Sequence, residues 1–243
     1  MWRLVLFFLI LLSGCTGNDT RDEMIIVKPT DSKLYSVATI QKITSSTAPV
    51  HIYIEGDGRA FNNRGQATYD PTPRSHFMRN MAESDTWPNV VYMARPCQFV
   101  MDNKCKASDW TDGRFSKQIV DSMAAAVKKV AASRPVILVG YSGGAMISGL
   151  IIQNHNDINV IQWITIAGVL NHNDWTEYFG DTPLSSSMNM NTLPRVSQVH
   201  YIAERDKIVP TVLSKKWIGK NKALLVLDAN HDTIPIIKLD FID

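Results

Sequence analysis

The stretch that decides the fold is PVILVGYSGGAMISGLII, residues 135–152. Its first five residues are an apolar run that predicts a buried strand, and its last eight predict a buried helix. The GYSGG segment between them supplies three glycines, which permit a turn too tight for larger side chains. Such a turn raises the hydroxyl of Ser142 above the sheet, where the helix N-terminus offers free amide donors and a partial positive charge. The pattern therefore predicts a nucleophilic serine at this position.

Two later segments supply the groups that activate a nucleophilic serine. Residues 199–202 predict a short strand whose following loop contains Asp206, and residues 223–227 predict a last strand that is followed by His231. A histidine can take the proton of the hydroxyl, and a carboxylate can hold that histidine in one tautomer. Because the carboxyl ends of parallel strands converge at the ligand end of an open α/β sheet, we expect these groups to meet.

In these features the chain resembles the α/β-hydrolase superfamily. The match rests on the G-x-S-x-G turn at Ser142, the Asp-x-x-Val-Pro segment at 206–210 and His231, and it covers most of the chain from about residue 50 onward. The resemblance implies that Ser142 is the nucleophile, that His231 is the general base and acid, and that Asp206 orients the histidine. It also implies an α/β-hydrolase fold, with a mostly parallel central sheet and helices on both faces, and a reaction without cofactor.

Other histidines and acids compete for two of these roles. Among the remaining histidines, His51 and His200 lie in strand-like runs, and His155 lies at the end of a helical segment. His76 and His172 lie in polar loops. Only the two in polar loops stay as outside candidates for the base. The acids that compete with Asp206 are Asp174, Asp181, Asp228 and Glu204. Asp228 would need an unusual turn, because it precedes His231 so closely, and Glu204 would need a different bend of its loop.

Acyl transfer also needs two hydrogen-bond donors for the tetrahedral oxyanion. The resemblance assigns one to the backbone amide of Gly143, the residue after the nucleophile. The other is expected from the loop that follows the predicted strand 50–54, and we assign it to the amide of Asp57. The superfamily often has His-Gly in this loop, whereas this chain has Glu55-Gly56. Neighbouring carboxylates would oppose an oxyanion unless they point away or pair with Arg59, and a plain glycine turn is the alternative interpretation.

The first 14 residues predict a signal peptide. A positive residue near the start precedes the apolar run 4–12, which is too short to span a bilayer. The ending LSGC, residues 12–15, resembles the lipobox of bacterial lipoproteins, which implies cleavage before Cys15 and lipidation of that cysteine. The residues that follow predict a polar tether, so that residues 15–30 form the lipidated cysteine and tether. An ordinary secretory signal with an accidental cysteine is the alternative.

The resemblance to lipoproteins also carries an expected location. Several acyl chains on one cysteine give stable anchoring to a membrane. Thr16, in the second mature position, resembles the signal for outer-membrane sorting. The chain is therefore expected in the bacterial cell envelope, anchored by lipid to the outer membrane and facing the periplasm or the cell surface.

Two cysteines remain once Cys15 is lipidated, and an even pair in an oxidising compartment predicts a disulfide. Cys97 and Cys105 bracket a short loop after the strand-like segment 90–94. Two free thiols or a metal pair are the alternatives. No histidine or further cysteine completes a zinc set, so no metal site is expected.

Length and composition indicate one catalytic domain over residues 31–243. The chain has 243 residues with 45% hydrophobic content, which suits a single large core. Its net charge of +2, with mixed signs, provides no patch for nucleic acid, and we expect a monomer. Residues 117–130 have the apolar spacing of a helix with Ser116 as N-cap, and residues 158–166 predict another buried strand. Alternating strands and helices predict a parallel sheet with right-handed crossovers.

The segment in which the superfamily most often inserts a lid is short and polar here. Residues 173–179 are the best candidate for a crossover helix, and residues 181–187 contain turn formers without an apolar face. Minimal or no lid is therefore expected, with an open pocket, no interfacial activation and a preference for small or soluble acyl substrates. The alternative is a longer cleft that Trp110 and Trp175 would line.

Together these features predict a lipid-anchored serine hydrolase of the envelope that cleaves carboxylic esters through an acyl-enzyme. Its partners would be a small acyl substrate and the membrane. A thioesterase, an amidase or an acyltransferase would use the same three residues. A lipoprotein that binds a ligand without turnover is a further alternative, and a structural anchor protein would not need all three.

Overall fold

The computed structural model describes residues 24–219 and 223–242. The elements follow one another as β1 (Ile25–Val27), β2 (Val37–Ile43), β3 (Val50–Ile54), α1 (Phe77–Ser84), β4 (Asn89–Met93), α2 (Lys117–Ala131), β5 (Val136–Tyr141), α3 (Gly143–Asn154), β6 (Val160–Ile166), α4 (His172–Phe179), β7 (Ser197–Ala203), α5 (Thr211–Ile218) and β8 (Ala223–Leu227), with short 3-10 helices at Ala107–Trp110 and His231–Thr233. The expected signal peptide and Cys15 lie outside these residues. In the described part of the chain, no helix has the length and apolarity to cross a bilayer.

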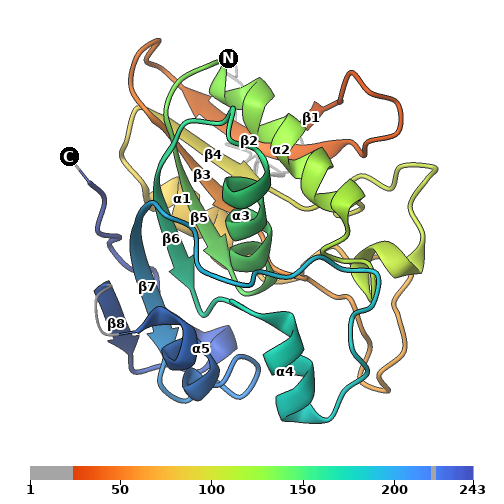
Figure 1. Cartoon of the computed structure of the whole chain (residues 1–243). Helices are drawn as coiled ribbons and strands as arrows, with labels where there is room; N and C mark the ends of the chain where they lie inside the picture. The colour runs from red at the N-terminus through yellow and green to blue at the C-terminus, as the bar shows by residue number, and fades with distance from the viewer. Residues whose placement is uncertain (1–23, 220–222, 243) are drawn as a thin grey trace, which may run out of the picture.

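Within the described residues, eight strands form one sheet, in the order β1-β2-β4-β3-β5-β6-β7-β8. Every neighbouring pair from β4 to β8 is parallel, whereas β1 with β2 and β2 with β4 pair antiparallel at one edge (Figure 1). The predicted mostly parallel sheet is confirmed. The predicted boundary at residue 31 is too late, because Ile25–Val27, inside the expected tether, already pair with Val37–Thr39.

Apolar side chains cover both faces of the sheet, because successive strand residues point to opposite sides. In β3, Ile52 and Ile54 pack in one cluster with residues of α2 and α3. Tyr53, between them, packs on the other face with Met78 of α1 and with residues near the C-terminus. Figure 1 shows α2 and α3 in front of the sheet and α1 behind it. The prediction of helices on both faces is confirmed.

Helix α2 follows its local sequence closely. It begins at Lys117, as predicted, and ends at Ala131 rather than at residue 130. The hydroxyl of Ser116 caps it by accepting a hydrogen bond from the N–H of Ile119 at 3.4 Å. Its last turn passes into a left-handed residue, Ala132, with φ 48°. The apolar face of helix α2 packs on the sheet beside α3.

The structure joins Cys97 and Cys105, which lie eight positions apart, in a disulfide with a Cα–Cα distance of 5.9 Å. Closing so short a loop in the unfolded chain stabilises the native state by ~2–3 kcal/mol in the chain-entropy model. We expect the Cys97→Ala/Cys105→Ala double variant to lose about that much free energy of unfolding in denaturant titration. Mature protein should also gain the mass of two hydrogens on reduction. Free alkylation of both thiols without a reductant would contradict the bond.

Candidate active site

The chain turns sharply at Ser142, between β5 and α3. Ser142 has φ 51° and ψ −121°, a conformation that a non-glycine residue keeps only when its surroundings enforce it. A Cβ on Gly140 would lie 2.5 Å from the carbonyl oxygen of Gly144, and one on Gly144 would lie 2.5 Å from the oxygen of Ile54. The glycines on both sides of the serine are therefore required by close backbone contacts, as the GYSGG segment predicts.

The structure brings together the three residues that the sequence analysis assigns to proton transfer. His231 Nε2 lies 3.1 Å from Ser142 Oγ, and His231 Nδ1 lies 2.7 Å from Asp206 Oδ2. Ser142 follows β5, Asp206 follows β7 and His231 follows β8, so all three stand at the carboxyl ends of parallel strands. In this chain of contacts a neutral His231 that donates Nδ1–H to Asp206 has its Nε2 lone pair facing the hydroxyl.

Asp206 is fixed from its other side by its own loop. Its Oδ1 accepts hydrogen bonds from the N–H groups of Ile208 at 2.8 Å and Val209 at 2.7 Å. The Asp206 side chain is only 1% exposed, and that of His231 is 7% exposed. The hydroxyl of Tyr141 donates to the backbone oxygen of His231 at 3.0 Å. Both the ring and the carboxylate are therefore held in one orientation away from bulk water.

The loop after β3 lies directly against the serine. A Cβ on Gly56 would lie 3.2 Å from Ser142 Cβ. The N–H of Gly56 already donates to Glu55 Oε1 at 3.0 Å, whereas the N–H of Asp57 has no acceptor in the described part of the chain. The N–H of Gly143 belongs to the first turn of α3, where no helical carbonyl can accept it. These two free amides are the pair expected for an oxyanion.

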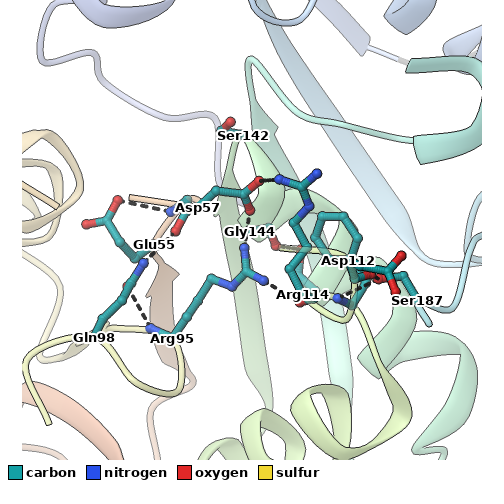
Figure 2. Close-up of polar contacts among 12 residues, drawn as sticks. Glu55, Asp57, Arg95, Gln98, Asp112, Arg114, Ser142, Gly144 and Ser187 are labelled. Atoms are coloured by element: carbon teal, nitrogen blue, oxygen red, sulfur yellow. Dashed lines mark hydrogen bonds and ion pairs between the residues drawn. The ribbon is translucent and has the colours of Figure 1, made fainter. Parts of the chain in front are cut away.

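The carboxylate of Asp57 is neutralised by two arginines. Figure 2 shows it between the guanidinium groups of Arg95 and Arg114. Asp57 Oδ1 accepts from Arg95, and Arg114 Nη1 lies 3.1 Å from Asp57 Oδ2. Burial by itself would raise the pKa of Asp57, but the two positive charges outweigh it and hold that pKa below its usual value.

Arg59, which the sequence analysis named as one possible partner of the carboxylates in this loop, does not pair with Asp57. Arg59 instead donates to the backbone oxygen of Asp70 at 3.3 Å. Arg95 follows β4 at the carboxyl edge of the sheet, so the rule that located Asp206 could have located it too. Arg114 lies in the loop before α2, and no sequence signal marks it.

Glu55 is the second carboxylate in this loop, and it is also held. Its Oε2 accepts a hydrogen bond from the hydroxyl of Tyr92 at 2.9 Å, in addition to the bond from Gly56. Burial, the largest effect, raises the pKa of Glu55 to about 7. This carboxyl group is therefore partly protonated near neutral pH, which lessens its opposition to an oxyanion.

No protein-family model matches the chain, and no curated protein matches it in sequence. Solved structures do match. The Pyrococcus furiosus esterase Pf2001 superposes with a TM-score of 0.59 at 16% identity, with 87% of each chain covered. An alpha-beta serine hydrolase homologue from Coxiella burnetii gives a TM-score of 0.52 at 14% identity, over 87% of this chain and 89% of the other. The chain has the α/β-hydrolase fold. The strand order, and the position of the sharp turn at Ser142 directly after β5, agree with that assignment.

Within this fold, the competing histidines and acids lie away from Ser142 or have other partners. His172 was expected in a polar loop, but it is buried in α4. Its Nε2 lies 3.1 Å from the backbone oxygen of Met188. The other competitors make contacts of their own or are exposed: His51 with Asp85, His155 with Asp121, His200 with Thr165, Asp174 with Lys216, Asp228 with Arg205, and His76, Asp181 and Glu204 at the surface. Among the described residues, only His231 forms a hydrogen bond with Ser142 Oγ.

A cavity of about 380 Å³ opens at Ser142 and His231. Its apolar wall includes Phe115, Trp175 and Leu184. Trp175 therefore lines the cavity, whereas Trp110 is buried near Arg95 and lines a separate small space. No group of three or more metal-ligating side chains gathers anywhere in the described chain.

The connection between β6 and β7 contains the crossover helix α4 at His172–Phe179, one position earlier than the predicted 173–179. Residues 180–196 contain no helix, and Leu184 from this segment forms part of the cavity wall. In the described part of the chain, no lid covers Ser142. The expectation of minimal or no lid is confirmed.

Proposed function

We propose that this chain hydrolyses carboxylic esters through a covalent acyl-enzyme on Ser142. The observation that carries the proposal is the continuous contact from Ser142 Oγ through His231 to Asp206, at 3.1 and 2.7 Å, on the floor of an open cavity. A weak nucleophile becomes reactive when an oriented base can take its proton, and this geometry provides that base.

The reaction follows from the contacts. His231 Nε2 takes the proton of Ser142 as Oγ attacks the acyl carbon, and the oxyanion accepts hydrogen bonds from the amides of Gly143 and Asp57. The imidazolium, stabilised by Asp206, then protonates the departing alkoxide oxygen as the ester C–O bond breaks. Water repeats the sequence, with its proton passing to His231 and then back to Ser142 Oγ, so that the acid is released and the enzyme regenerated.

The same triad serves thioesters, amides and transfer to acceptors other than water, so labelling must be combined with substrate profiling. A fluorophosphonate probe should modify Ser142, as peptide mass mapping can show. Oxygen esters of increasing chain length should then be compared with the matched thioester and amide. We expect the oxygen esters to give the highest kcat/KM. Absence of labelling at Ser142 would favour a ligand-binding protein without turnover.

The open cavity supports a preference for short or soluble acyl groups without interfacial activation. A closing lid needs an apolar helix to cover the site and to meet lipid, and residues 180–196 contain no helix. We expect the rate on a short-chain ester to saturate smoothly as its concentration passes the solubility limit. A sharp rise in rate as droplets form would contradict this and indicate lipase behaviour.

We further propose that lipidation of Cys15 anchors the enzyme in the bacterial envelope, at the outer membrane. The support is the apolar run followed by LSGC in the sequence, and the polar stretch before β1. Wild-type protein should partition into the detergent phase of a phase-separation extraction. Cys15→Ser should block lipidation, and a protein that begins after Cys15 should be water-soluble and active. Recovery of the intact wild-type protein in the aqueous phase would contradict the proposed lipid anchor at Cys15.

A further inference from the structure

A second hollow adjoins the active-site cavity. It measures about 920 Å³ and has Arg59, Arg74 and Arg79 in its wall, so we call it the arginine hollow. Arg59, Pro73 and Arg74 line both spaces. The two spaces therefore share part of their walls and lie side by side.

Arg79 is the unusual member of this wall. It is on α1, is only 5% exposed, and its Nε has no hydrogen-bond acceptor in the described chain. Unlike Arg95 and Arg114, which share Asp57, none of the three arginines of the hollow forms an ion pair with a described residue. A buried guanidinium without a bound carboxylate is unfavourable, because its lost hydration is not replaced.

The acids near these arginines are already engaged. Asp70 lines the hollow, but its Oδ1 accepts from the N–H of Thr72 at 2.8 Å. Glu55 is close enough to Arg79 for an electrostatic interaction, but its two oxygens accept from Gly56 and Tyr92. Three arginines and His76 thus line the hollow, and Asp70 is the one acidic residue in its wall.

We propose that the arginine hollow is a subsite for an anionic group, a phosphate or a carboxylate, carried by the ester that Ser142 attacks. This rests on the proposed function and adds the substrate class. A guanidinium presents donors in a fork that matches the oxygens of phosphate or carboxylate, so arginine suits such a group better than lysine. Met24, Ile26, Phe99 and Met101 also line the hollow, which therefore accepts an apolar part of the same ligand.

The test compares esters that differ only in an anionic group. One pair is mono-4-nitrophenyl adipate and 4-nitrophenyl hexanoate, which places a carboxylate on the acyl side. The other pair is 4-acetoxyphenyl phosphate and 4-methylphenyl acetate, which places a phosphate on the leaving group. The quantity measured is the ratio of kcat/KM for the anionic ester to that for its neutral partner, and the pair whose ratio depends on the arginines identifies the anion.

We expect Arg79→Gln and Arg74→Gln each to lower that ratio roughly tenfold for at least one pair, the size of one lost charge-assisted hydrogen bond. Arg79→Lys keeps the positive charge, so its ratio should lie between that of Arg79→Gln and that of the wild type. Arg64→Gln is the matched control, because Arg64 is exposed in the same loop region and lines neither space, and its ratio should equal that of the wild type. Arg74 is exposed, so its variant reports on the subsite even if Arg79→Gln does not fold.

Ratios that stay at the wild-type value in Arg74→Gln, and in Arg79→Gln where that variant folds, for both pairs, would overturn the subsite while leaving the esterase proposal intact. If the wild type cleaves none of the four esters, the proposed function fails separately. Calorimetric titration with phenyl phosphate and adipate then decides the subsite alone. Binding that Arg74→Gln weakens about tenfold, and Arg64→Gln does not, supports it, and no binding of either anion overturns it.

Discussion

Ser142→Ala is expected to lower kcat for ester hydrolysis about a million-fold while the protein stays folded. The loss is so large because the covalent step disappears and His231 has no hydroxyl to deprotonate. The fold should survive because, among the described residues, Ser142 Oγ hydrogen-bonds only to His231, and a methyl group fits where the hydroxyl stood. Initial rates on 4-nitrophenyl acetate, measured with enzyme at high concentration, give the residual activity, and thermal unfolding shows whether the fold is retained.

Ser32→Ala is the matched control for this substitution. Ser32 is exposed in the turn that precedes β2, and its hydroxyl has no hydrogen bond within the described chain. Its variant should hydrolyse the ester at the wild-type rate and unfold at the wild-type temperature. Wild-type-like hydrolysis by pure Ser142→Ala protein would remove Ser142 as the nucleophile.

The elements that the sequence predicts well are those whose signal is local. The elbow at Ser142 is specified by glycines within a few residues, and α2 by its own apolar spacing and Ser116 cap. The sequence analysis assigns Asp206 and His231 because chain order and strand ends restrict where an acid and a base can lie. The 2.7 and 3.1 Å contacts of His231 agree with those positions.

The features that sequence analysis missed depend on distant parts of the chain. β1 has three residues, and its place in the sheet depends on pairing with β2 across an intervening loop. The neutralisation of Asp57 depends on Arg95 and Arg114, which come 38 and 57 positions later. The polar neighbours of His172 predict a loop. Its burial depends on packing against Phe115, which is distant in the sequence. Of the residues in these contacts, only Arg95 has a positional signal in the sequence, because it follows the end of a strand.

Asp206→Asn is expected to lower kcat about ten-thousandfold, because it reverses the tautomer of His231. Asp206 Oδ1 accepts from the N–H groups of Ile208 and Val209, so those donors will hold the amide oxygen of the asparagine at the Oδ1 position. The amide NH₂ then occupies the Oδ2 position and donates to His231 Nδ1. The ring must carry its proton on Nε2, which points at Ser142 Oγ as a donor and has no lone pair to take the hydroxyl proton.

The Asp206→Asn variant should keep its fold and the geometry of the site, and lose only the basicity of His231 Nε2. Fluorophosphonate labelling of Ser142 should slow in parallel with kcat, and KM should change little, because Asp206 does not line the cavity. Asp228→Asn is the control, since Asp228 also precedes His231 but its side chain is 79% exposed and pairs with Arg205. That variant should keep full activity. If Asp228→Asn lost activity and Asp206→Asn stayed within tenfold of the wild type, the orienting carboxylate would be Asp228, and the order of acid and base that the fold implies would have to be revised.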